Sequence, residues 1–275
     1  MATAERVCCP LPLCVRAARH GVDSRLAIAR SAPDAAPMEL PALLAVSIGP
    51  PVASAAWFYL RDREREPLGA VVWAFLAGAI VVAVAVFAAV PLARLGVPFA
   101  HPWAHGAYVA FVLAAIPEEL AKYLFLRRHI RSHHCDEPMD GMVYGALVSL
   151  GFAAAENVLY VLQGGLSVGF WRAFTAVPLH ASCGALMGLA LASRKLLGPG
   201  PGRGLLPALV VPILIHGLYD WPLMALSRRG EPEYAESLLA TMGNLTVLVV
   251  AIAWVRMNST RLRGHQDGRA SRRDA

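Results

Sequence analysis

Residues 70–90 read AVVWAFLAGAIVVAVAVFAAV, an apolar stretch without a single charge. An α-helix rises about 1.5 Å per residue, so this stretch is long enough to cross the hydrocarbon core of a bilayer, which is about 30 Å thick. Other apolar stretches of similar length flank it on both sides. The expected spans are about 41–60, 68–90, 105–126, 141–163, 171–193, 205–226 and 237–255. The sequence therefore predicts an all-α fold, a polytopic transmembrane helical bundle of about seven spans, with six to eight possible.

The composition supports a membrane protein. Of 275 residues, 57% are hydrophobic and only 16% are charged, whereas a soluble domain carries about 25% charged residues. This composition excludes an ordinary cytosolic protein, a disordered chain and a nucleic-acid binder. The net charge of +6 comes mainly from arginine clusters between the apolar stretches, which is where topology-setting residues of membrane proteins lie. The lipid bilayer is therefore the expected partner, and no nucleic acid is expected.

The arginines also predict an orientation. The loops 61–66, 127–138 and 194–204 are rich in arginine, as is the end of the chain, and the intervening loops are poor in it. By the positive-inside rule, the basic loops and the C-terminus lie in the cytoplasm of a multi-pass plasma-membrane protein. Residues 257–275 are expected to form a disordered, basic cytoplasmic tail near anionic lipid.

The first 37 residues conflict with this topology. Seven spans place the N-terminus outside, yet residues 1–37 contain five arginines and do not resemble a signal peptide. We expect 38–256 to be the membrane domain, with Met38 as the natural start and 1–37 as a mis-annotated extension or a disordered leader. A second expectation in this region is that Gly49-Pro50-Pro51 kinks or shortens the first span.

Three ionisable residues lie together inside the third span. An ionisable side chain near the bilayer centre costs about 2.5–3.5 kcal/mol on insertion scales, so Glu118, Glu119 and Lys122 require an explanation. Glu118 and Lys122 are i, i+4 neighbours and can form an ion pair. A purely structural ion pair leaves Glu119 unexplained, whereas two close carboxylates favour an acid/base pair.

Four more such residues lie in the following spans: Glu156, His180, His216 and Asp220. His216 and Asp220 are one helical turn apart, so the carboxylate can orient the imidazole. Each residue alone is also compatible with a structural hydrogen bond. Counting about 1.5 Å per residue, however, all of them fall within a layer about two turns thick in the outer half of the membrane. We therefore expect them to meet.

A second group of candidate metal ligands lies in the loop 127–138. His129, His133, His134 and Cys135 are ligand types that suit zinc. The loop is also strongly basic and lies on the cytoplasmic side in the predicted topology. We therefore favour a solvated, topology-setting loop over a zinc site.

Five motifs on successive spans resemble those of the PrsW family of intramembrane proteases, which is related to the CPBP superfamily of type II CAAX proteases. The resemblance covers about 38–226 and includes His180. The motifs are YLRDRERE (59–66), EELAK (118–122), DGMVYG (140–145), FAAAEN (152–157) and HGLYD (216–220). Characterised members cleave a membrane-anchored anti-sigma factor on its extracytoplasmic side, so the resemblance implies a single-pass membrane protein as substrate.

The resemblance also implies the roles of individual residues. The matching catalytic positions are Glu118, Glu119, His216, His180, Glu156 and Asp220, and the supporting positions are Lys122, Asn157 and Asp140. In a glutamic-type mechanism, one glutamate activates water and no cofactor is required. In a zinc mechanism, His180, His216 and Glu119 bind Zn²⁺. We favour the glutamic type.

Two other functions remain as alternatives. Intramembrane Glu, His and Asp residues also build the proton relays of transporters, but such a transporter predicts an internal repeat, and the motifs do not recur in the other half of the chain. The third possibility is a non-catalytic relative that binds peptides.

Overall fold

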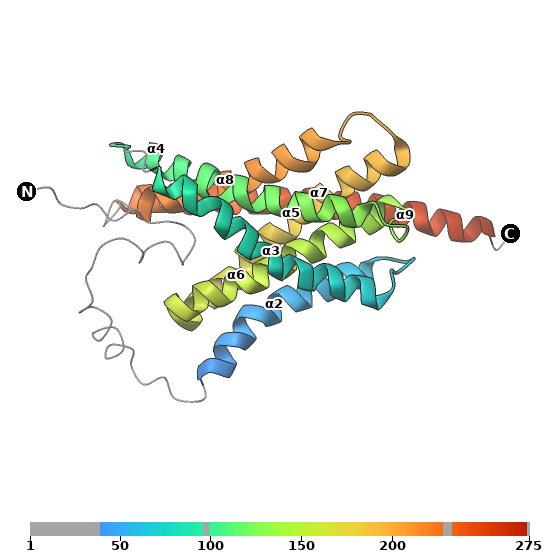
Figure 1. The fold of residues 1–275 in the computed structure, drawn as a ribbon, viewed down its shortest axis with the longest axis horizontal. Coiled ribbons are helices and arrows are strands. Elements are labelled where there is room, and N and C mark those ends of the chain that lie inside the picture. Colours follow the sequence, from blue (N-terminus) through green and yellow to red (C-terminus); the bar gives the residue numbers. More distant parts are fainter. Residues whose placement is uncertain (1–38, 96–98, 228–232, 274–275) are drawn as a thin grey trace, which may run out of the picture.

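The structure is a computed structural model, and it describes residues 39–95, 99–227 and 233–273. All regular elements of these residues are helices, and the long ones lie side by side in a bundle (Figure 1). In chain order they are α2 (Glu39–Arg61), α3 (Leu68–Arg94), α4 (Pro102–Ala107), the π-helix η1 (Tyr108–Ala115), α5 (Ile116–Ile130), α6 (Pro138–Phe174), α7 (Ala176–Leu197), the π-helix η2 (Leu206–Val210), α8 (Val211–Ser227) and α9 (Tyr234–Arg273). The predicted all-α helical bundle is confirmed. The proposed leader 1–37 lies outside the described residues.

Six helices of the described chain are long and apolar enough to cross a membrane. The third predicted span is not one of them, although α4, η1 and α5 follow one another without a gap from residue 102 to 130. This helical rod is about 44 Å long at 1.5 Å per residue. It contains the buried residues Glu118, Glu119 and Lys122, so the segment that departs from a plain membrane helix is one that carries three buried charges.

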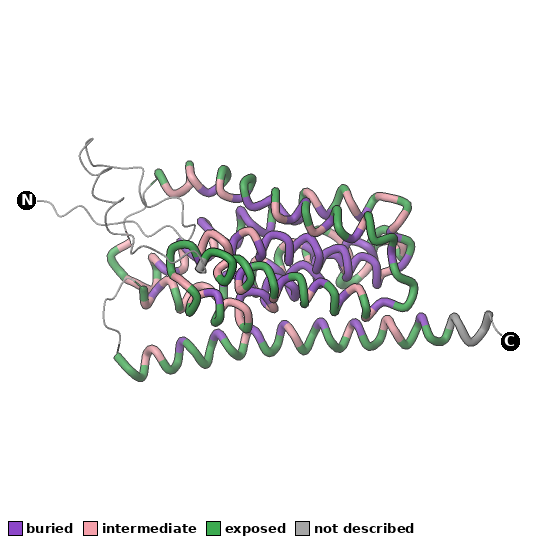
Figure 2. The backbone as a smooth tube through the Cα atoms, turned by 90° about the horizontal axis from the view of Figure 1, so that it is seen from below, coloured by how far each residue is buried: buried purple, intermediate pink, exposed green. Residues whose placement is uncertain are grey.

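Two helices occupy the centre of the bundle. The most apolar window of α6 is 72% buried and that of α7 is 83% buried, against 22% for α2 and 28% for α9. Figure 2 shows the buried residues concentrated in the middle of the bundle, while α9 runs along one side and projects past its end. Side chains on α6 and α7 are therefore shielded by the remaining helices.

Glycines allow α6 and α7 to approach each other closely. A Cβ atom at Gly145 would overlap the carbonyl oxygen of Gly184, and one at Gly188 would overlap the carbonyl oxygen of Gly141. Small residues at such positions are the usual way for membrane helices to pack backbone against backbone. This contact fixes the two central helices against each other.

The predicted loop 164–170 is helical. Helix α6 is interrupted only at Gly165, where φ is +75°, a left-handed conformation that glycine adopts without strain. In a straight helix residues 156 and 172 would be about 24 Å apart, yet their side chains are hydrogen-bonded. The segment after Gly165 therefore folds back toward Glu156, and the next helix, α7, begins at Ala176 rather than at residue 171.

The structure corrects two other expectations about local structure, the first of them in part. Pro50 and Pro51 do not shorten helix α2, which continues through them from Glu39 to Arg61, since prolines are tolerated inside membrane helices. The C-terminal stretch is helical to Arg273 instead of disordered. Its polar residues contact the end of α2: Ser259 accepts a hydrogen bond from Arg61 at 3.3 Å.

The glycine contact gives a first prediction. Substituting Gly145→Ala should destabilise the bundle by about 1–3 kcal/mol, because the added methyl overlaps backbone that cannot move aside. The matched control Gly243→Ala lies in α9 with open space around it, and it should be neutral or stabilising by up to about 1 kcal/mol. Unfolding in mixed micelles titrated with dodecyl sulfate measures both. Equal effects of the two substitutions would contradict the close contact.

Candidate active site

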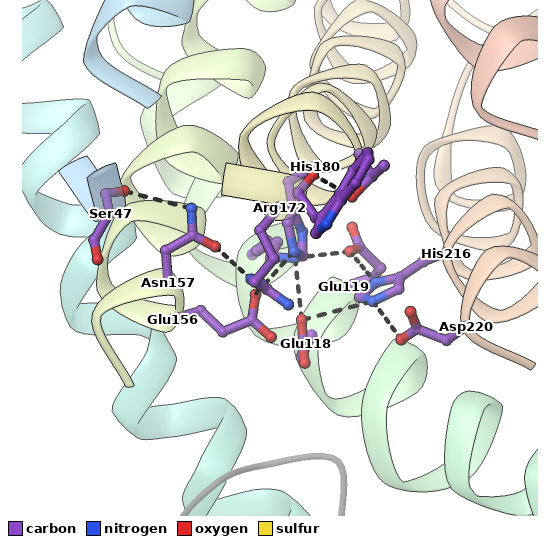
Figure 3. Close-up of polar contacts among 12 residues, drawn as sticks. Ser47, Glu118, Glu119, Glu156, Asn157, Arg172, His180, His216 and Asp220 are labelled. Atoms are coloured by element: carbon purple, nitrogen blue, oxygen red, sulfur yellow. Dashed lines mark hydrogen bonds and ion pairs between the residues drawn. The ribbon is translucent and has the colours of Figure 1, made fainter. Parts of the chain in front are cut away.

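Eight ionisable side chains from four helical segments meet inside the bundle, and we call them the polar cluster. They are Glu118, Glu119 and Lys122 from α5, Glu156 and Arg172 from the two arms of α6, His180 from α7, and His216 and Asp220 from α8. Figure 3 shows the side chains from these helices pointing toward one another. Most are almost completely buried, and Glu119 and Lys122 are 0% exposed.

Lys122 lies at the centre of the cluster. Its ammonium donates a 2.8 Å hydrogen bond to Glu119 Oε1 and lies 3.5 Å from Glu118 Oε2. It also lies 3.1 Å from Nδ1 of His180 and 3.9 Å from the ring centre of Phe152. The three nitrogen–hydrogen bonds of an ammonium thus have three acceptors. The predicted pair of Glu118 and Lys122 is confirmed, but the shorter contact is with Glu119.

His180 is held in one tautomer by its two neighbours. Lys122 can only donate, so Nδ1 of His180 accepts and Nε2 carries the hydrogen. Nε2 lies 3.0 Å from Glu156 Oε2, which accepts that hydrogen. Arg172 then fixes Glu156: its Nη2 donates to the same oxygen at 2.6 Å, and its Nε donates to Asn157 Oδ1 at 2.6 Å.

His216 lies between two carboxylates. Its Nδ1 is 2.9 Å from Glu119 Oε1, and its Nε2 is 3.2 Å from Asp220 Oδ2. The predicted orientation of His216 by Asp220 is thus present in the structure. Oε1 of Glu119 has two donors, but the other oxygen, Oε2, is buried and accepts no hydrogen bond from the described residues. Glu119 therefore presents one free carboxylate oxygen inside the cluster.

The structure brings together nearly all of the predicted site residues. Asn157 lies at the edge, where its amide donates to the Ser47 carbonyl at 3.4 Å. Asp140 lies apart, in the first turn of α6, sixteen residues or about 24 Å before Glu156. The residue that sequence reasoning missed is Arg172, because the fold-back at Gly165 was not anticipated; the pair Gly164-Gly165 was the available signal.

The histidine-rich loop does not form a metal centre in the described part of the chain. His129 packs its ring against Tyr144, with ring centres 4.4 Å apart, and His133 stacks on His134. Cys135 is buried, and its thiol lies 3.9 Å from the carbonyl oxygen of Glu137, to which it can donate. The possible ligand atoms of these four side chains do not converge on a common point.

The amino-acid sequence is similar to those of known proteins. The profile described as PrsW family intramembrane metalloprotease matches residues 66–255. The chain belongs to the PrsW family. It is 37% identical to Protease PrsW of Geobacillus kaustophilus over 190 residues, which is 68% of this chain and 82% of that protein. Protease PrsW of Bacillus subtilis is 36% identical over 189 residues, 68% of this chain and 84% of the relative. Protease PrsW of Clostridioides difficile is 30% identical over 220 residues, 77% of this chain and 87% of the relative. No solved structure shows significant similarity.

The description of PrsW proteins as metalloproteases raises the question of a metal in the polar cluster. Glu118, Glu119, His180 and His216 each offer a ligand atom, and these atoms lie within 4.8 Å of one another. Their chemistry suits zinc. The Lys122 ammonium, however, lies within 3.5 Å of three of these residues, and a second cation among the same atoms would be repelled. The arrangement therefore does not fit a zinc ion while Lys122 is in place.

The central lysine gives a second prediction. Lys122→Met keeps the length of the side chain but leaves two buried glutamates without their cation, so it should destabilise the protein by about 3–5 kcal/mol. The matched control is Lys195→Met, which removes the other lysine of the chain. Lys195 is exposed and bonds two loop carbonyls, so its loss should cost about 1 kcal/mol.

A double mutant tests the cause of that loss. Glu119→Gln removes the charge that Lys122 neutralises, so the pair Glu119→Gln with Lys122→Met should be less destabilised than the sum of the two single changes. Unfolding in mixed micelles provides the four free energies. Additive losses would show that Lys122 does not act through Glu119.

Proposed function

We propose that this chain is a glutamic-type intramembrane endopeptidase that requires no metal and cleaves a single-pass membrane protein, such as an anti-sigma factor, near the extracytoplasmic side. The observation that carries the proposal is the environment of Glu119: one oxygen is held by Lys122 and His216, and the other is free and buried. A fixed carboxylate with an available lone pair is suited to take a proton from water. Membership of the PrsW family supports hydrolysis over transport or peptide binding without cleavage.

The neighbouring groups supply the other roles that peptide hydrolysis needs. Glu119 Oε2 accepts a proton as water attacks the scissile carbonyl carbon. His216 donates from Nδ1 to Glu119 and from Nε2 to Asp220, so it is a cation in the proposed mechanism, and its positive charge stabilises the oxyanion that develops on the carbonyl oxygen. Glu118 has the longer of the two glutamate contacts with Lys122, 3.5 Å against 2.8 Å for Glu119. The ammonium therefore stabilises the charged form of Glu118 less, and Glu118 is the candidate donor of the proton that the leaving amine requires. Collapse of the intermediate breaks the carbon–nitrogen bond and releases a carboxylic acid and an amine.

A groove on the membrane-facing surface supports a transmembrane substrate. Its volume is about 760 Å³, and α3 and α6 line it with residues Ala79, Val82, Ala83, Val86, Phe87, Val90, Pro91, Arg94, Ala155 and Leu159. The lining is almost wholly apolar, as contact with a membrane helix requires. Ala155 directly precedes Glu156 in the sequence, so the groove runs along the part of α6 that carries this member of the polar cluster.

The proposed orientation follows from the arginines. The loop after α2 and the loop between α5 and α6 are basic, and the positive-inside rule places them in the cytoplasm together with the C-terminus. The polar cluster lies away from those loops, which supports cleavage toward the opposite side of the membrane. The cell membrane is the proposed location.

The mechanism gives a third prediction. In vesicles that contain the enzyme and a candidate single-pass anti-sigma factor, Glu119→Gln should lower the cleavage rate by about 10²–10⁴-fold, because the amide cannot accept the proton. The matched control Glu64→Gln removes an exposed carboxylate and should leave the rate unchanged. Gel analysis of the cleavage products measures both.

Treatment with a chelator separates the two mechanisms. We expect full activity of the wild-type enzyme after treatment with 1,10-phenanthroline. Loss of activity that added Zn²⁺ restores would overturn the glutamic mechanism in favour of a zinc site made by His180, His216 and Glu119. Unchanged cleavage by Glu119→Gln would sink both mechanisms.

The groove gives a fourth prediction. Ala83→Trp fills it, so cleavage of a membrane-anchored substrate should fall by at least about tenfold, as expected when a contact of roughly 1.4 kcal/mol is lost. The control Val84→Trp adds the same ring to a neighbouring exposed position that does not line the groove. Equal cleavage by the two variants would show that the substrate enters elsewhere.

A further inference from the structure

Three carboxylates converge at the other end of the long central helix, and we call them the carboxylate triad. Asp62 directly follows α2, Glu137 precedes α6, and Asp140 lies in the first turn of α6. Each offers an oxygen within 4.8 Å of the other two. Asp62 and Asp140 are 1% exposed and Glu137 is 5% exposed. Asp140 is about 24 Å along α6 from Glu156, so the triad is separate from the polar cluster.

Hydrogen bonds satisfy only some of the buried carboxylate oxygens of the triad. Glu137 and Asp140 form a capping box: the Glu137 side chain accepts from the backbone of Asp140, and Asp140 Oδ2 accepts from the backbone of Glu137 at 2.8 Å. Asp62 accepts a backbone hydrogen bond with one oxygen only: Glu64 N–H donates to its Oδ1 at 3.1 Å. Its Oδ2 is buried and accepts no hydrogen bond from the described residues. Burial raises the pKa of the Asp62 carboxyl.

Two carboxylates of the triad also form no ion pair with a basic side chain of the described residues. Among the described ion pairs, none involves Asp62 or Asp140. Glu66 lies nearby and adds a fourth carboxylate, which Tyr144 bonds at 2.8 Å. Burying several carboxylates together is unfavourable unless a positive charge compensates them. The unpartnered oxygen of Asp62 therefore points to a missing ligand.

We propose that Asp62, Glu137 and Asp140 bind a divalent cation such as Ca²⁺ at the N-terminal end of α6. Oxygen-only ligands select Mg²⁺, Ca²⁺ or Mn²⁺ over zinc. Oxygens that share one Ca²⁺ lie about 2.3–2.6 Å from it, so they are at most about 5 Å apart, and the spacing of the triad meets this limit.

Gln266 completes the site from the C-terminal helix. Its Nε2 donates to Asp62 Oδ1 at 2.7 Å and also to Glu137 Oε1, so an amide with partial positive charge now lies between two carboxylates. Rotation of this amide by half a turn presents its oxygen, a suitable ligand for a hard cation. A bound ion then links the loop after α2, the start of α6 and the far part of α9. Its role is to hold the cytoplasmic ends of three helices together.

The test uses the full-length protein in nanodiscs after removal of metals with a chelator. Electron paramagnetic resonance should count one bound Mn²⁺ per chain, and Ca²⁺ should displace it and raise the melting temperature in a saturable way. Asp62→Asn should weaken Mn²⁺ binding by at least about tenfold. The control Glu64→Gln alters an exposed carboxylate of the same loop and should bind normally. His216→Ala, which disrupts the polar cluster, should also bind normally and so excludes that cluster as the source of the signal.

A separate readout distinguishes a metal ligand from a structural residue. In chelator, Asp62→Asn should melt no lower than wild type, because it removes a buried charge that has no described ion-pair partner and keeps an amide oxygen that can accept from Gln266. Asp140→Asn keeps an amide oxygen that can cap α6, so it tests the ligand role if Asp62→Asn does not fold. Absence of a bound Mn²⁺ in the wild type would overturn the proposal. So would unchanged binding by the substitution at Asp62 or, where that variant does not fold, at Asp140.

Discussion

The structure depends on one constraint: charge inside a membrane protein must be neutralised by other charge. Each ionisable group costs about 2.5–3.5 kcal/mol to insert, so isolated acidic residues in α5, α6 and α8 would oppose assembly. Lys122 and Arg172 convert that cost into contacts between helices. Lys122 in α5 bonds Glu119 of its own helix and His180 of α7. Arg172 bonds Glu156 across the turn at Gly165. The helices must therefore adopt one relative register for these charges to be satisfied.

The tight packing of α6 against α7 makes that register specific. Backbone contact at Gly145 and Gly188 leaves little freedom for one helix to slide along the other. Glu156 and His180 lie farther along the same two helices, and their 3.0 Å hydrogen bond requires the register that the glycines set. Small residues near one end of the pair thus position the reactive groups farther along it.

The sequence was sufficient to predict the helical bundle and most of the polar cluster, because charge in an apolar stretch is conspicuous in any sequence. It could not predict that Arg172 joins the cluster. Residue spacing along a straight helix places Arg172 about 24 Å from Glu156, and only the left-handed conformation at Gly165 reverses the chain. The helical end of α9 was missed for a related reason. Its polar composition is typical of a tail, whereas contacts of Ser259 and Gln266 with the end of α2 and the loop after it hold it in place.

The balance of charge in the polar cluster also bears on its chemistry. Four carboxylates, of Glu118, Glu119, Glu156 and Asp220, face only two permanent cations, Lys122 and Arg172. In surroundings of low dielectric a net charge of −2 is costly, so the cluster is neutral only when it holds two further protons on carboxyl or imidazole groups. Peptide hydrolysis needs a base and an acid at the same time. In the proposed mechanism, a buried cluster with more carboxylates than cations supplies both, because the same groups that share the extra protons can accept one from water and donate another to the leaving amine.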